Sequence, residues 1–330
     1  MNNLTKIICI FLTIALIASN AFWIMNTPDS EQQEKISVRF AYQFGFHYGQ
    51  QIIMDHFDLV EKWSNGVAVA TYQTINGGTS QLEAFIGESL EFGSMGAAPA
   101  VKGISQGVDI KIFATMGQKQ AAIWTWREDI DSLADIKLGD TVNVAAVNSV
   151  YHMSLIKAFT DIGRTVNDVN DVVVFYSHPD AYQLMEQREI DAVFASAPYN
   201  SMYEKAGYKY IGDEPSIWGT PMAGSVIVGR VSFCEENPEI ASAVYMAWLE
   251  ATNWINTNPE EASYIIGEVY GYNMNEVWQD FQEANLVFNP TFGLSALKNF
   301  ANIMYDLDVI DKQLSEQDMI FEHSLGVIGR

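Results

Sequence analysis

The feature that most constrains the fold is an alternation of short β-rich runs with amphipathic helical runs, which starts at Lys35. Residues 36–42 alternate apolar and polar side chains with the two-residue period of a strand. Residues 47–63 then repeat their apolar side chains with the period of a helix. Strands that alternate with helices pair in parallel through right-handed crossovers, so the pattern predicts an α/β fold with mostly parallel sheets flanked by helices.

The alternation occurs in two blocks, and an almost entirely helical tail follows from Pro238. Two such blocks predict two lobes, and the tail is expected to pack back on the first. Lobe 1 is expected to hold residues 35–118 and 224–330, and lobe 2 to hold residues 119–223. Strands are expected over residues 36–42, 67–72, 91–95, 110–116, 141–145, 172–176, 191–195, 208–211 and 225–228.

The N-terminal segment predicts export. Lys6 precedes an apolar run over residues 7–18, and small residues follow at Ser19 and Ala21, which is the layout of a cleaved secretory signal. The alternative is an uncleaved anchor, because about 20 apolar residues can span a bilayer. Residues 1–25 are therefore interpreted as a signal peptide or anchor, and residues 26–34 as a polar linker, which places the folded part outside the cytoplasm.

Composition excludes several classes of function. The formal net charge of -23 disfavours nucleic acid as a partner, because a strongly acidic surface repels phosphate. If residues 1–25 are removed, Cys234 is the only cysteine left and no intramolecular disulfide forms. The five histidines lack metal-ligand spacing, and no phosphate-binding glycine loop or nucleophile elbow occurs. The sequence predicts no metal, no cofactor and no catalytic residues, and hence a protein that is not an enzyme.

Candidate binding residues follow the predicted strands. In open parallel sheets, ligands bind beyond the carboxyl ends of the strands, where helix N-termini present free amides. The amides near Ser149 and Ala97 are expected to hold an anionic or carbonyl group, while His47 and Gln118 orient the rest of the ligand. The predicted ligand-binding residues are Gln43, His47, Gly96, Ala97, Ala98, Gln118, Asn148, Ser149, Val150 and Ala197.

These loops are poor in cationic side chains, with Lys119 as the main candidate. Such a site suits a monoanion held by amides and hydroxyls, or a neutral ring, better than a multiply charged anion. Aromatic side chains for stacking on a flat ligand are plentiful near the loops. They are Tyr42, His47, Tyr48, Trp124, Tyr151, Tyr176, Tyr199 and Trp218.

Several segments, in their order and spacing, resemble a known family. Residues 77–87 lead into a strand and loop over residues 92–100, and residues 107–114 form the next strand. Residues 130–142 are similar to the family's segment ADLKGKTV, and residues 189–193, together with the later Pro198, are similar to its strand G-x-x-DA. The chain thus resembles the extracytoplasmic solute-binding proteins of ABC importers, in the branch for nitrate, sulfonate, taurine and thiamine pyrimidine precursors.

The resemblance implies a two-lobed type II periplasmic-binding-protein fold. It also implies a monomer that captures a small solute between its lobes and delivers it to a membrane permease. The expected solute is a small anion of the sulfonate, taurine or nitrate type, and a neutral aromatic heterocycle such as a thiamine pyrimidine precursor or a flavin is the alternative. Enzymes with the same fold, such as a pyrimidine synthase or a menaquinone-pathway dehydratase, form the competing class, and the export signal argues against them.

Overall fold

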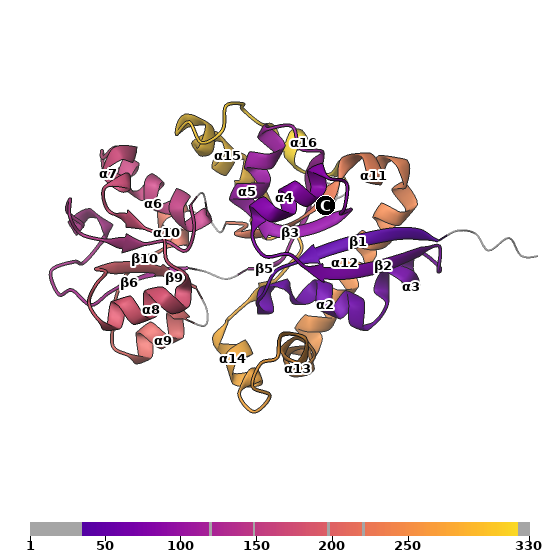
Figure 1. Cartoon of the computed structure of the whole chain (residues 1–330), viewed down its shortest axis with the longest axis horizontal. Coiled ribbons are helices and arrows are strands. Elements are labelled where there is room, and N and C mark those ends of the chain that lie inside the picture. The colour runs from indigo at the N-terminus through magenta and orange to yellow at the C-terminus, as the bar shows by residue number, and fades with distance from the viewer. Residues whose placement is uncertain (1–34, 119–120, 148, 197–198, 220–221, 323–330) are drawn as a thin grey trace, which may run out of the picture. The chain divides into compact units, whose positions relative to one another are not determined.

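The computed structural model has the alternation of strands and helices that the sequence predicts (Figure 1). The expected signal or anchor and the linker lie outside the described residues. From Ser37 onward the chain forms one compact unit. The structure describes residues 35–118, 121–147, 149–196, 199–219 and 222–322.

The first sheet combines strands from distant parts of the chain, in the order β2-β1-β3-β11-β4. Its central strands β3 and β11 are buried almost throughout, whereas in β2 at the edge only Ala68 is buried and the other residues are partly or fully exposed. This difference is expected, because only the central strands are covered on both faces. The strands are β1 (Ile36–Tyr42), β2 (Ala68–Thr74), β3 (Phe92–Gly96), β4 (Ile110–Thr115) and β11 (Ser225–Arg230).

Strand β11 lies between β3 and β4 and runs antiparallel to both. Ser225 faces Gly96 and Val226 faces Thr115, so the segment that returns from the second half of the chain is inserted into the middle of the first sheet. β1 and β3 are parallel, as a βαβ unit requires. The long return of β11 therefore ties the two halves of the chain through backbone hydrogen bonds.

The second sheet has the order β10-β6-β9-β7-β8. β7 pairs in parallel with β8 and β9, and β6 pairs antiparallel with β9 and β10. Its strands come from the second block of the sequence, with β6 taken from the segment that leaves the first sheet. They are β6 (Ala122–Thr125), β7 (Val142–Asn143), β8 (Val173–Val174), β9 (Ala192–Ala195) and β10 (Lys209–Asp213). The lobe boundaries proposed from the sequence stay a prediction.

The helix expected over residues 47–63 is interrupted. Asp58 has a positive φ of 47°, a left-handed conformation that aspartate tolerates better than most residues, and it separates two shorter helices. A 3-10 turn, η1 (Phe46–Tyr48), precedes them. The helices of this block are α2 (Gly49–His56), α3 (Leu59–Trp63), α4 (Gly78–Ile86) and α5 (Ala97–Ser105).

The second block contains helices whose starts are fixed by side-chain caps. The Ser149 hydroxyl accepts a hydrogen bond from the backbone N–H of His152, and the Ser177 hydroxyl accepts one from that of Asp180. Two short helices, α7 and α10, are additions to the predicted pattern. The helices are α6 (Val150–Asp161), α7 (Val166–Asn170), α8 (His178–Glu186), α9 (Tyr199–Lys205) and α10 (Glu214–Trp218).

The helical tail packs against elements of the first block. α12 contacts α2 and α3, and Ile320 near the end bridges to Ile112 of β4. No helix in the described ranges combines the length and the apolar character needed to cross a membrane. The remaining elements are α11 (Val231–Glu236), α12 (Pro238–Thr257), α13 (Pro259–Tyr270), α14 (Val277–Glu283), α15 (Leu297–Asp306), α16 (Glu316–Met319), η3 (Leu294–Ala296), η2 (Leu133–Asp135) and the paired short strands β5 (Gly117–Gln118) and β12 (Val287–Phe288).

An ionic cluster around the buried Glu91 carboxylate joins β1, the start of β3 and β11. The Glu91 carboxylate, whose side chain is 3% exposed, pairs with the guanidinium groups of Arg39 in β1 and Arg230 in β11. Its Oε2 atom also accepts the backbone N–H of Arg39 at 2.8 Å. We call Arg39, Glu91 and Arg230 the Glu91 cluster. Because a buried charge is tolerated only when it is paired, this cluster fixes the register of the strands around it.

Candidate ligand-binding site

A cavity of about 350 Å³, here called the main cavity, is enclosed by loops that follow strands of both sheets. A volume of this size is at the lower end of the range of about 300–1,000 Å³ found for small-molecule sites. It is lined by Gln43, Phe44, His47, Tyr48, Gly77, Gly78, Gly96, Pro99, Gln118, Ala145, Ala146, Ser149, Val150, Tyr151, His178, Glu214, Gly224 and Ser225.

Several helices begin at the wall of the main cavity. Gly78, Val150 and His178 are the first residues of α4, α6 and α8, and each of them lines the cavity. The N–H groups of a helix's first turn have no carbonyl partner within the helix, and the helix dipole adds partial positive charge there. The cavity wall is therefore rich in donors, which suits an anionic or carbonyl group.

Six of the ten residues predicted from the sequence line the main cavity, and they come from both blocks. Contact with a ligand stays a prediction for each of them. They are Gln43, His47, Gly96, Gln118, Ser149 and Val150. Asn148 and Ala197, together with Lys119, lie outside the described residues.

Ala97 and Ala98 are fully buried and are absent from the lining of the main cavity. The Ala97 N–H donates a hydrogen bond to the Gly224 carbonyl at 3.0 Å, so this amide joins the start of α5 to the returning chain. The expectation that the Ala97 amide holds a ligand group stays a prediction, and in this structure the amide already has a backbone partner. Because β11 is inserted next to β3, the first turn of α5 faces the backbone of the returning chain.

The Gln118 side chain joins the two segments that cross between the sheets. Its amide nitrogen donates to the carbonyls of Met116 at 2.8 Å and Ser225 at 2.9 Å, and its oxygen accepts the Gly224 N–H at 2.7 Å. We call this set of bonds the Gln118 clamp. Backbone groups already occupy the Gln118 side-chain amide, so it has a structural role, and its predicted role in orienting a ligand stays a prediction.

Gln43 acts in a similar way on the loop before α4. Its amide nitrogen donates to the Ser94 carbonyl at 2.9 Å, and its oxygen accepts the Gly77 N–H at 2.9 Å. The Phe44 N–H donates to the Asn76 side-chain oxygen at 3.2 Å. These bonds hold the glycine pair ahead of α4 against the cavity. Gln43 therefore shapes the wall.

Two tyrosines line the main cavity, Tyr48 near the first sheet and Tyr151 near the second. Burial raises the pKa of the Tyr48 phenol well above its usual value. Burial also raises the pKa of the Tyr151 phenol, and the nearby charge of Glu214 adds to the effect. Both hydroxyls therefore stay protonated at neutral pH, while Phe44, whose ring is tilted against that of Tyr270 with the centroids 4.7 Å apart, adds an apolar wall.

The charge of the cavity differs from what an inorganic anion site would need. Among the described lining residues there is no lysine or arginine, and Glu214 supplies a carboxylate that is 5% exposed. Its oxygens accept the Ala121 N–H and the Ser154 hydroxyl, both at 3.4 Å. Sequence reasoning missed Glu214, although its position just after a predicted strand, at the start of a helix, was the signal that could have found it.

The described residues contain no group of three or more potential metal ligands. Among the described residues, Cys234 is the one cysteine, and it is buried in α11. Burial raises the pKa of its thiol to about 12. A thiol with such a pKa is not a nucleophile at neutral pH.

Comparison with known proteins places the chain in a family. Residues 31–268 match the NMT1-like family, which is more than half of the 330 residues, so the chain belongs to the NMT1-like family. Among curated proteins, no sequence matches this chain.

Solved structures share the fold at low sequence identity. The periplasmic aliphatic sulphonate binding protein SsuA from Escherichia coli is 19% identical with a TM-score of 0.70, over 86% of this chain and 92% of that one. The periplasmic nitrate-binding protein NrtA from Synechocystis is 11% identical with a TM-score of 0.67, over 89% and 88% of the two chains. These similarities confirm the predicted periplasmic-binding-protein fold and the resemblance to this class of proteins.

Proposed function

We propose that the chain is the extracytoplasmic solute-binding component of an ABC importer and that the main cavity holds the solute. One observation carries the proposal: segments from both sheets, including three helix starts, converge on a single cavity of about 350 Å³. The similar structures are named as sulphonate- and nitrate-binding proteins, which supports a transported small molecule.

In this proposal the lobes, residues 35–118 with 224–330 and residues 119–223, close on the solute by bending at the crossing segments. The solute shifts the equilibrium toward the closed form because it contacts both lobes only there. The closed monomer then docks on the permease. Residues 1–25 direct export, either as a cleaved signal or as a retained anchor.

The lining favours a solute that combines an anionic group with an N–H donor, as in the aminoalkanesulfonate taurine. The helix starts at Val150 and His178 suit the sulfonate. The Glu214 carboxylate, in a lining whose described residues include no lysine or arginine, suits an ammonium group. A simple dianion would meet the repulsion of this carboxylate.

A second candidate is an aminated aromatic heterocycle of the thiamine-precursor type. Phe44, Tyr48 and Tyr151 favour it, because these aromatic side chains line the cavity and can pack on a flat ring. The amino group of such a ring would also donate to Glu214. Neither candidate requires a catalytic step, and with either one the protein is a binding protein.

Isothermal titration calorimetry with taurine, ethanesulfonate and an aminopyrimidine tests the proposal. We expect taurine to bind, and to bind more tightly than ethanesulfonate by about tenfold or more, because ethanesulfonate lacks the ammonium that Glu214 accepts. Glu214→Gln is expected to remove this difference, whereas the exposed Glu236→Gln is a matched control that keeps it.

A preference for the aminopyrimidine would select the second candidate. Saturable binding of none of these solutes, with a chemical conversion detected instead, would overturn the binding-protein proposal in favour of an enzyme. A thermal shift provides an independent readout, since a ligand at about 100 times its Kd adds about 2.7 kcal/mol of stability.

A further inference from the structure

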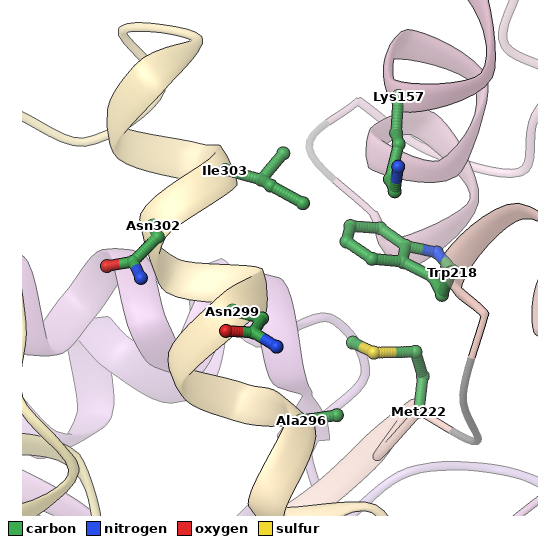
Figure 2. Close-up of a pocket in the computed structure, with 7 residues that line it drawn as sticks. All are labelled: Lys157, Trp218, Met222, Ala296, Asn299, Asn302 and Ile303. Carbon is green, nitrogen blue, oxygen red and sulfur yellow. The ribbon is translucent and has the colours of Figure 1, made fainter. Parts of the chain in front are cut away.

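A second cavity of about 350 Å³ shares no lining residue with the main cavity. We call it the side cavity. Figure 2 shows it between α6, which carries Lys157, and α15, which carries Asn299 and Ile303, with Trp218 and Met222 completing the wall. Its chemistry is also different, because it combines a lysine with an aromatic face.

The aromatic face is held in place by neighbours behind it. The Trp218 indole N–H donates to the Ser154 hydroxyl at 2.8 Å, and the Trp218 ring centroid lies 5.2 Å from that of Phe300. Met222, 8% exposed, lies beside the ring and Ile303 points toward it from the opposite side (Figure 2). A planar ligand could therefore pack on a surface that is already ordered, so little side-chain entropy would be lost on binding.

One polar group lies over this face and another lies across the cavity from it. The Lys157 ammonium is 5.9 Å from the Trp218 ring centroid and pairs with Asp161 at 2.6 Å, one helical turn further on. The Asp161 side chain is 52% exposed, so water screens this pair and an entering anion can compete for the ammonium. Across the cavity, the Asn299 side-chain amide has no hydrogen-bond partner among the described residues, and it points toward Met222 (Figure 2).

We propose that the side cavity is a second small-molecule site and that it takes a planar aromatic monocarboxylate. The ring packs on Trp218 between Met222 and Ile303, and the carboxylate pairs with the Lys157 ammonium. A polar substituent at the far end of the ring then reaches the Asn299 amide. This site requires no solute in the main cavity, and its walls come from both proposed lobes.

Titration calorimetry of the whole protein with 4-hydroxybenzoate tests this. We expect saturable binding with a Kd below about 1 mM, and a loss of about tenfold or more in Lys157→Gln, because a charge-assisted hydrogen bond is lost. Asp161→Asn is the matched control on the same helix and should bind as well as the wild type or better, since it frees the ammonium. Asn299→Ala should weaken 4-hydroxybenzoate but leave benzoate unchanged.

Benzylamine, which has the same ring with a positive charge, should not bind. Equal binding of benzylamine, unchanged binding in Lys157→Gln or no saturation up to about 5 mM would each overturn the proposal. A further variant, Val150→Trp, fills the main cavity and should leave 4-hydroxybenzoate binding intact. Loss of binding in this folded variant would place the probe in the main cavity and overturn the assignment.

Discussion

Replacing Gln118 by leucine should destabilise the protein, because the Gln118 clamp joins the two crossing segments through a side chain that is only 4% exposed. Leucine has a similar size but neither donates nor accepts hydrogen bonds. The Ser225 carbonyl keeps a partner, since it also accepts the Met116 N–H at 3.2 Å. The Met116 carbonyl and the Gly224 N–H lose the bonds at 2.8 Å and 2.7 Å.

Each buried backbone group left unpaired costs about 1–3 kcal/mol, so the two together predict a loss of about 2–6 kcal/mol in the free energy of unfolding. For a chain of this size, each kcal/mol lowers Tm by about 2–4 °C. Urea denaturation followed by circular dichroism measures the loss, provided that the slope with urea matches that of the wild type.

Gln279→Leu is the matched control for this measurement. Its amide bonds to Glu283 at 2.9 Å on the surface, where water can replace the lost partner. The control is expected to stay within about 0.5 kcal/mol of the wild type. If the free energy of unfolding of Gln118→Leu also lies within about 0.5 kcal/mol of the wild-type value, the clamp does not stabilise the two crossing segments and the reasoning is refuted.

Three further substitutions test the fold and the site. Glu91→Gln should cost about 3–5 kcal/mol in urea denaturation, because it leaves the Arg230 guanidinium, whose side chain is 13% exposed, without its carboxylate partner; a loss below about 1 kcal/mol would contradict this. Gly117→Ala places a methyl group 2.7 Å from the Phe288 ring and 3.0 Å from the His47 backbone at the main cavity, so calorimetry should show weaker solute binding than in Gly87→Ala, whose added methyl meets nothing nearer than 3.4 Å. Lys205→Gln should lower stability by about 0.2–1 kcal/mol at pH 7, and equal melting temperatures at neutral pH would argue against this. The hydrogen bond from Lys205 lowers the pKa of the Glu283 carboxyl in the folded state. The stability that this ion pair contributes is therefore present above the unfolded carboxyl pKa of about 4.3 and should disappear as pH falls below that value. Thermal melts from pH 7 to pH 3 measure this loss.

Much of the architecture could be predicted from the sequence because it depends on local patterns. The alternation of apolar residues located β1, β3 and β4 to within one residue, and Ser149 marked the start of α6 through its hydroxyl cap. Since ligand sites in such sheets lie where helices begin, the same local signals brought six predicted residues to the main cavity. These features require only neighbours within a few positions along the chain.

Local patterns were less reliable where a residue's role depended on distant partners. The break at Asp58 interrupts an amphipathic pattern that predicts one continuous helix, and Glu214 begins a helix too short for periodicity to indicate. The short strand β7 has only two residues, so its place in the sheet depends on its pairing with β8 and β9.

The sequence by itself determined the class of fold, the order of most elements and the loops that form the candidate site, because periodicity and capping act between residues close in the chain. The tertiary structure alone decided what those loop residues do. Gln118 and Gly224 are 106 positions apart, yet their hydrogen bond gives a side chain that was expected to bind the ligand a second role, as a clamp. Insertion of β11 beside β3 engages the Ala97 amide, because backbone groups brought together by a long return of the chain satisfy each other before any ligand arrives.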